Sequence, residues 1–241
     1  MGSFLNCAAL RYAKGESFVR GRSHCVSCGH PLSARDLIPL FSWLFLRGRC
    51  RYCGVKISAR YLWAEITGCI VFVSVVLRFG VSPETAEYLI LASLTLALAF
   101  TDLACRLLPD GLILAGLAVR IVFILCSENV PGEALQSVIG AFSVSLPVFL
   151  LVLLMEKVWK KEAMGGGDIK LLFMLGSYLS WQENLLGLIL ACVFGLLFAA
   201  IGKKDSGTDR QIPFGPAIAL GSWASLLFGQ ALLAGYLSLF L

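Results

Sequence analysis

The chain has 241 residues, of which 58% are hydrophobic and 15% are charged, with a mean hydropathy of +0.83. Soluble domains usually carry about a quarter charged residues, and the apolar residues here lie in long blocks, so the composition excludes an ordinary soluble protein. The charge is uneven: residues 1–60 hold ten Lys/Arg and two acids, although the whole chain has a net charge of +5. The positive-inside rule explains a basic cytoplasmic segment, so we expect no nucleic-acid partner.

Four cysteines within the basic segment form two CxxC pairs, separated by 21 residues. This spacing is typical of a tetrahedral four-cysteine zinc site. A cytoplasmic location disfavours structural disulfides. A redox-active cysteine pair is the alternative to the zinc site. We predict a cytoplasmic, zinc-ribbon-like domain over residues 1–60, in which a structural zinc supplies folding energy. The predicted ligands are Cys25, Cys28, Cys50 and Cys53.

Seven apolar segments follow, and residues 61–241 form the predicted transmembrane domain. A helix needs about 20 residues to cross a membrane, and the third and fifth segments are shorter than this. The predicted fold is therefore an all-α polytopic membrane protein with about seven transmembrane helices and an N-terminal four-cysteine domain. The segments are approximately 61–77, 85–108, 111–126, 134–155, 169–181, 184–202 and 214–241.

The loops between these segments alternate in charge, and every second loop is basic, as the positive-inside rule requires. The loop 81–87 carries Glu84 and Glu87 without a base, whereas the loop at 156–164 carries three lysines. The alternation predicts that the C-terminus lies on the non-cytoplasmic side. The regions predicted to face the cytoplasm are 1–60, 102–110, 156–168 and 203–213.

Two aspartates lie at the cytoplasmic level of the predicted bundle. Asp102 falls inside the second apolar segment, and Asp168 opens the fifth after three glycines. A carboxyl group in or beside lipid is costly unless it is paired, hydrated or used. One charged and one protonated carboxyl can together cleave a peptide, because the first takes a proton from water and the second donates one to the carbonyl oxygen. The sequence therefore predicts an aspartic protease site with Asp102 and Asp168 as catalytic residues.

The two carboxyls are expected to differ in charge. The start of a helix favours an anion by about 0.3–1 kcal/mol, which favours Asp168 as the base, whereas apolar surroundings favour a neutral Asp102. The glycines at 165–167 are expected to adopt positive φ and to admit an extended substrate strand. Structural alternatives stay open: Asp168 as the N-cap of a helix after a flexible loop, and Asp102 as a hydrogen-bonded or snorkelling carboxyl.

Three more charged residues have structural interpretations. Arg120 lies near mid-membrane and is expected to pair with a carboxyl or with backbone carbonyls. Asp110 follows a proline and precedes an apolar segment, which predicts an N-cap. Lys170 lies two residues past Asp168 and could tune its pKa.

Seven short stretches of the chain resemble bacterial type IV prepilin peptidases, which are membrane aspartic proteases of the GxGD type. In that family GSFLN follows an apolar first helix, whereas here it begins at residue 2, so seven apolar segments are expected in place of eight. The matching stretches are GSFLN (2–6), RSHCVSC (22–28), DLIPLFSWL (36–44), RGRCRYCG (47–54), RYLWAE (60–65), TDLACRLLPD (101–110) and GGGDIKLL (165–172).

The resemblance implies a reaction, substrates and a location. Such enzymes remove the short basic leader from prepilins or pseudopilins, after a glycine, at the cytoplasmic face of the bacterial inner membrane. Members of this type then methylate the new N-terminus with S-adenosylmethionine. The catalytic aspartates of the family correspond to Asp102 and Asp168, and its zinc-type cysteines correspond to the four named above. The expected partners are prepilins or pseudopilins and membrane lipid; the residues that bind S-adenosylmethionine and the oligomeric state are left open.

Two other functions remain open at this point. A proton-coupled transporter could relay protons through the same carboxylates, but it predicts an inverted repeat of broken helices, which the sequence does not show. A non-catalytic assembly factor for a pilus or secretion machine would use the four-cysteine domain as a docking surface.

Overall fold

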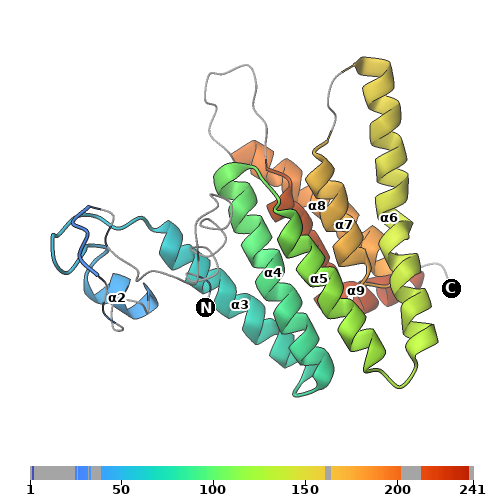
Figure 1. Cartoon of the computed structure of the whole chain (residues 1–241), viewed down its shortest axis with the longest axis horizontal. Coiled ribbons are helices and arrows are strands. Elements are labelled where there is room, and N and C mark those ends of the chain that lie inside the picture. Colours follow the sequence, from blue (N-terminus) through green and yellow to red (C-terminus); the bar gives the residue numbers. More distant parts are fainter. Residues whose placement is uncertain are drawn as a thin grey trace.

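The computed structural model describes residues 2, 25, 27–31, 33, 39–160, 164–201 and 213–238. Regular structure in these ranges is helical, as the sequence predicts, and Figure 1 labels the helices. They are α2 (Pro39–Phe45), α3 (Arg60–Phe79), α4 (Pro83–Cys105), α5 (Asp110–Leu125), α6 (Val130–Trp159), α7 (Gly166–Gly176), α8 (Trp181–Ile201) and α9 (Gly215–Leu237).

The helices α3 to α9 correspond to the seven predicted apolar segments. Five of these seven are long and apolar enough to cross a membrane, namely α3, α4, α6, α8 and α9. The third and fifth segments are short, as expected: α5 has 16 residues and α7 has 11. The helix α4 ends at Cys105, whereas the corresponding predicted segment ends at residue 108. The helix stops there because Arg106 adopts the left-handed backbone conformation, with a φ of 55°. The chain is a multi-pass membrane protein.

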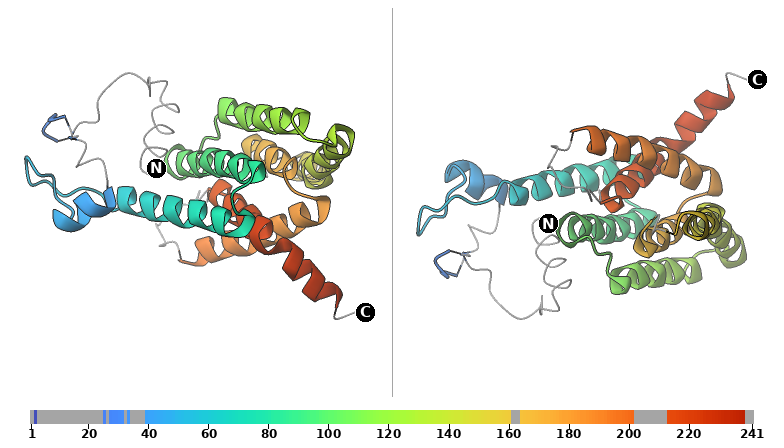
Figure 2. Two further views of the ribbon diagram at one scale, coloured as in Figure 1. Left: turned by 90° about the horizontal axis from the view of Figure 1, so that it is seen from below. Right: turned by 90° about the horizontal axis from the view of Figure 1, so that it is seen from above.

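The helix ends gather on two sides of the bundle (Figure 1). The C-terminal ends of α4, α6 and α8 lie at one side, together with the N-terminal ends of α5, α7 and α9. This arrangement agrees with the alternation of basic loops along the sequence. Figure 2 shows α4 to α7 gathered on one side of the bundle and α8 crossing α9 on the other. The boundary between residues 1–60 and 61–241 remains a prediction.

The short helix α7 lies at the centre of the core. Its residues Leu171, Leu172 and Met174 are fully buried, and they pack against Leu98 of α4 and Ile218 of α9. Lipid tails are as apolar as these side chains, so the close fit between helices contributes more to association here than burial does. A short helix with a fully enclosed middle therefore depends on contacts at its two ends.

The contact between α6 and α7 is close because two glycines face each other. A methyl group on Gly140 would overlap the carbonyl oxygens of Gly176 and Leu179. The carbonyl oxygen of Gly140 also accepts a hydrogen bond from the amide of Asn184 at 2.8 Å. Small residues at such positions let two backbones approach and bring their polar groups into range.

We expect Gly140→Ala to destabilise the bundle by about 1–3 kcal/mol, the usual cost of overpacking a dense core. The measurement is the thermal unfolding of the purified protein in detergent. Gly235→Ala is the matched control, because a methyl group there would meet no described atom within 4 Å. An equal unfolding temperature for both variants would contradict the close α6–α7 contact.

Candidate active site

Asp102 occupies the last turn of α4 and is only 6% exposed. Its Oδ2 accepts a hydrogen bond from the backbone N–H of Gly215, with an N···O distance of 2.8 Å. Gly215 is the first residue of α9, so the carboxyl lies on the N-terminus of a helix that is more than 100 residues away in sequence. Free N–H groups and the helix dipole at this position favour a negative charge.

Asp168 lies in the first turn of α7, where its own N–H donates to the carbonyl oxygen of Gly165 at 3.0 Å. Gly165, with a φ of −64°, is the N-cap, so the alternative of Asp168 as N-cap is wrong. The expectation of positive φ at the three glycines is also wrong. Instead, Gly167 gives room: a methyl group there would lie 3.0 Å from Cβ of Leu108, in the link between α4 and α5.

The two aspartates lie on the same side of the bundle, where α4 ends and α7 begins (Figure 1). The charge of Asp102 acts on the carboxyl of Asp168, so the two groups lie within electrostatic range of each other. Two neighbouring carboxyls do not both ionise easily, and they titrate as a pair. Each of them lies at the N-terminus of a helix, Asp168 on its own helix and Asp102 on α9. The dipole argument that favours Asp168 as the base therefore applies to both residues.

Gly215 is a residue that the sequence analysis missed. A methyl group on it would lie 2.7 Å from Oδ2 of Asp102, so only glycine leaves space for the carboxyl. Its signal in the sequence is the pair Gly215-Pro216 at the start of the last apolar segment. Proline favours the first turn of a helix, and this pair marks a helix start at the same level as Asp102.

An ion pair joins Nζ of Lys170 in α7 to Oδ1 of Asp110 in α5, at 2.7 Å. Asp110 is the first residue of its helix and Pro109 holds the N-cap position, so the predicted N-cap role of Asp110 is wrong. The side chains are 55% and 63% exposed, and exposed pairs contribute about 0–1 kcal/mol. The ammonium of Lys170 thus contacts Asp110.

The four predicted cysteine ligands form one cluster. Their sulfur atoms all lie within 4.8 Å of one another, and Sγ of Cys25 is 3.8 Å from Sγ of Cys53. A tetrahedral site with Zn–S bonds of about 2.3 Å has sulfur–sulfur distances of about 3.8 Å. The cluster could therefore hold a metal ion with little movement. The loop between α2 and α3, which carries Cys50 and Cys53, lies with α2 away from the helices α4 to α9 (Figure 1).

The two cysteine turns have the same backbone pattern. Gly29 N–H donates to Cys25 O at 2.8 Å, and Gly54 N–H donates to Cys50 O at 2.9 Å. Both glycines have positive φ, 68° and 72°, which a residue with a side chain rarely adopts. Each turn folds the backbone around its cysteine pair, and the two turns together bring four sulfur atoms to one place.

The thiol of Cys25 is prepared for metal binding by backbone donors. Hydrogen bonds from the N–H groups of Cys28 and Ser27 lower the pKa of Cys25 to about 6, well below the usual value for a thiol. The thiolate is the form that binds a metal. His30 stacks against Tyr52, with ring centroids 3.7 Å apart, and it is not part of the cluster.

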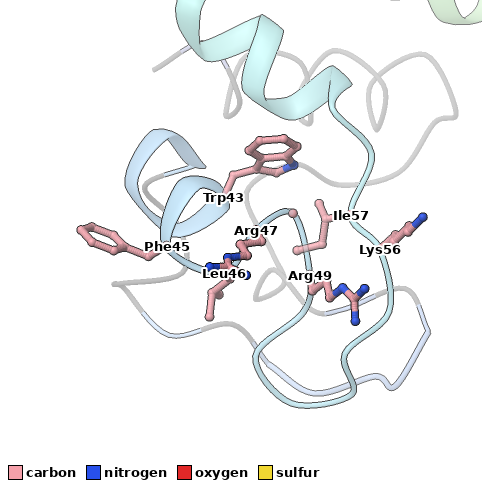
Figure 3. Close-up of a pocket in the computed structure, with 8 residues that line it drawn as sticks. Trp43, Phe45, Leu46, Arg47, Arg49, Lys56 and Ile57 are labelled. Atoms are coloured by element: carbon pink, nitrogen blue, oxygen red, sulfur yellow. The ribbon is translucent and has the colours of Figure 1, made fainter.

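A cavity of about 620 Å³ lies between α2 and the loop that carries the second cysteine pair (Figure 3). Trp43 and Phe45 come from the helix, whereas Arg49 and Lys56 lie on the two arms of the loop, opposite each other in an antiparallel bridge. No acidic side chain is among the described residues that line the cavity. The lining residues are Trp43, Phe45, Leu46, Arg47, Gly48, Arg49, Lys56 and Ile57.

Two protein families match the chain. Residues 1–79 match the Bacterial Peptidase A24 N-terminal domain, and residues 89–200 match the Type IV leader peptidase family. The first match includes all four clustered cysteines, and the second includes both aspartates.

Several curated relatives carry the name prepilin leader peptidase/N-methyltransferase. The relative from Aeromonas salmonicida (strain A449) is 39% identical over 220 residues, which are 90% of this chain and 75% of the relative. The relative from Pseudomonas putida is 34% identical over 219 residues, with 90% and 75% of the two chains covered. The relative from Myxococcus xanthus (strain DK1622) is 37% identical over 221 residues, with 87% and 64% covered. No solved structure matches the chain significantly.

Proposed function

The chain belongs to the type IV leader peptidase family, and we propose that Asp102 and Asp168 are the carboxyl pair with which it cleaves leader peptides. It is a membrane peptidase that processes prepilins, and it has N-methyltransferase activity toward the product. The observation that supports the assignment of the two aspartates is their meeting at one end of the bundle, each at the N-terminus of a helix. The family match supports neither a transporter nor a non-catalytic assembly factor.

The geometry suits a shared-proton mechanism. The pair carries one proton, so one carboxyl is charged and accepts a proton from the attacking water, while the other donates to the carbonyl oxygen of the substrate. The N–H of Gly215 binds Oδ2 of Asp102 and leaves Oδ1 for the reaction. When the tetrahedral intermediate collapses, the newly protonated carboxyl passes its proton to the leaving amine. Because both carboxyls lie at helix N-termini, either can begin as the base.

The location follows from the charge pattern. The bacterial inner membrane is the expected membrane, with the four-cysteine segment and the aspartate end of the bundle on the cytoplasmic side, because the basic loops lie at that end. The substrates expected there are prepilins or pseudopilins, with a basic leader followed by a hydrophobic helix. An exposed basic leader stays in water while the helix remains in lipid, so the cleavage site reaches the level of the two aspartates.

The residues present fit zinc but they do not identify a site for the methyl donor. The four sulfur atoms lie within 4.8 Å of one another, and no other ligand type joins them among the described residues, which matches a closed structural zinc site. S-adenosylmethionine would supply the methyl group, and it carries a positive sulfonium. The cavity beside the cluster is lined by cations and by no described carboxylate, so its residues do not suit that charge, and we assign it no step of methyl transfer.

Neutralising either aspartate should abolish cleavage. We expect Asp102→Asn and Asp168→Asn to lower the cleavage rate of a purified prepilin by about 10²–10⁴-fold, the contribution typical of a general acid or base. Mass spectrometry of the product gives the cleavage rate, and methylation of an already cleaved pilin by the same preparation is the control for folding. Full cleavage by either variant would overturn the assignment.

Gly215→Ala should lower the cleavage rate without removing a catalytic group. The added methyl group would lie 2.7 Å from Oδ2 of Asp102 and must displace the carboxyl. A displacement of about 1 Å can lower a rate by about 10²-fold. Gly235→Ala, near the other end of the same helix, should cleave at the wild-type rate. Wild-type cleavage by Gly215→Ala would show that the N–H bond to Asp102 does not position it.

Zinc should be lost when one cysteine of the cluster is replaced. We expect the wild type to contain about one zinc ion per chain and Cys50→Ser to contain little, because a four-cysteine site needs all its ligands. Inductively coupled plasma mass spectrometry measures the zinc content. Cys192→Ser is the control, since Cys192 lies on α8, outside the cluster. Equal zinc content in both variants would exclude the cluster as the metal site.

A further inference from the structure

Arg120 makes an unusual set of contacts for one side chain inside the bundle. It projects from α5 with only 13% of its side chain exposed. Its Nη1 binds Oε1 of Glu87 in α4 at 2.9 Å, and its Nη2 lies 3.4 Å from Oε2 of Glu133 in α6. Its Nε donates to the backbone carbonyl oxygen of Ser177, just after α7, at 3.0 Å. One guanidinium therefore connects α5 to three neighbouring helices.

The contact with Ser177 stabilises the C-terminal end of α7. With 11 residues, α7 is about 16 Å long, roughly half the thickness of the lipid core. The carbonyl oxygens of its last residues accept hydrogen bonds from the N–H groups of Ser177, Tyr178 and Leu179 in the turn that follows. The carbonyl of Ser177 itself lies within the protein and needs donors from other helices. Ser177 O accepts one bond from Arg120 and a second from the Ser137 hydroxyl at 2.8 Å. The cation of Arg120 also suits the negative end of the helix dipole.

The same side chain links the two helices that carry the aspartates. Glu87 and Asp102 lie on α4, and Ser177 follows the helix that begins with Asp168. The helix α5 packs against both α4 and α7, and Arg120 makes a polar contact with α4 and with Ser177, just after α7. The hydroxyl of Tyr178 adds a hydrogen bond to the carbonyl oxygen of Gly116 in α5. At the opposite end of α7, the ion pair with α5 is exposed and therefore weak. The position of α7 along α4 depends on its buried end.

We propose that Arg120 is a positioning residue for leader cleavage, acting through α7. By binding Glu87 and the carbonyl of Ser177 at once, it fixes α7 relative to α4, and with it the separation of the two aspartates. The proposal rests on the assignment of Asp102 and Asp168 as the catalytic pair. Arg120 itself contacts neither aspartate, because it lies at the far end of both helices, roughly 22 Å along α4 from Asp102.

The two activities of the enzyme distinguish positioning from general stability. A variant that only unfolds the bundle loses cleavage and methylation in parallel, because both fall with the amount of folded protein. A variant that moves α7 loses cleavage, which needs both aspartates, and keeps methylation of an already cleaved pilin. The ratio of the two rates in one preparation therefore does not depend on the folded fraction.

The experiment compares Arg120→Gln, Arg120→Lys and Ser137→Ala with the wild type and with Ser225→Ala. Ser225→Ala is the matched control, since it removes a buried bond of 2.6 Å from α9 to the carbonyl of Glu183 and leaves α7 untouched. For each protein, kcat and KM of prepilin cleavage and the rate of methylation of cleaved pilin are measured in the same detergent. The wild type and Asp102→Asn are measured first, which tests the catalytic assignment separately.

We expect Arg120→Gln to lower the kcat of cleavage by about 10²-fold, with KM and the methylation rate changed by no more than about two-fold. The kcat of cleavage by Arg120→Lys should lie between that of Arg120→Gln and that of the wild type, because an ammonium keeps the charge but not the forked donors. Ser225→Ala should match the wild type in both reactions. Parallel loss of cleavage and methylation in Arg120→Gln, or unchanged cleavage, would overturn the proposal.

Ser137→Ala covers the case in which Arg120→Gln does not accumulate. It removes one of the two bonds to Ser177 O and leaves the ion pair intact. We expect its kcat of cleavage to fall by about 3–10-fold with methylation unchanged. If Ser137→Ala cleaves at the wild-type rate, or loses both activities equally, the end of α7 does not position Asp168.

Discussion

A backbone group inside lipid must find its hydrogen-bond partner within the protein, and α7 is the helix on which this constraint acts most strongly. It is too short to reach water at both ends, yet it carries Asp168 and lies at the centre of the core. The turn after it bonds the carbonyls of its last residues, and Arg120 and Ser137 donate to the carbonyl of Ser177 in that turn. The other end of α7 carries Asp168 in its first turn. A short helix thus allows a polar residue at bundle depth, provided that neighbouring helices supply the missing donors.

The aspartate site depends on helix termini as much as on the two carboxyls. Asp168 uses the start of its own helix, and Asp102 uses the start of α9 through the N–H of Gly215. Each terminus offers unpaired donors and a favourable dipole, which offset part of the cost of a charge near lipid. Both helix termini therefore help the pair to carry a negative charge.

Much of this arrangement could be predicted from local patterns. Apolar blocks predict the seven helices, the loop charges predict which ends lie together, and the spacing of Cys25 to Cys53 predicts the cluster. Contacts between distant helices could not be predicted, because they depend on the rotation and depth of each helix. Glu87 was assigned to an acidic loop, but it lies inside α4, only 5% exposed, as the partner of Arg120. The hydrogen bond from Gly215 to Asp102 is also a contact between distant helices, so it could not be predicted either.

The glycines before Asp168 have a different conformation from the one that the sequence predicts. They were expected to adopt positive φ, but Gly166 and Gly167 continue the helix. A methyl group on Gly167 would press on Leu108, whereas one on Gly166 would meet no described atom within 4 Å. Gly167 therefore serves the approach of α7 to the α4–α5 link, whereas Gly166 borders open space among the described residues. An extended peptide backbone needs such space to bring its carbonyl carbon between two carboxyls.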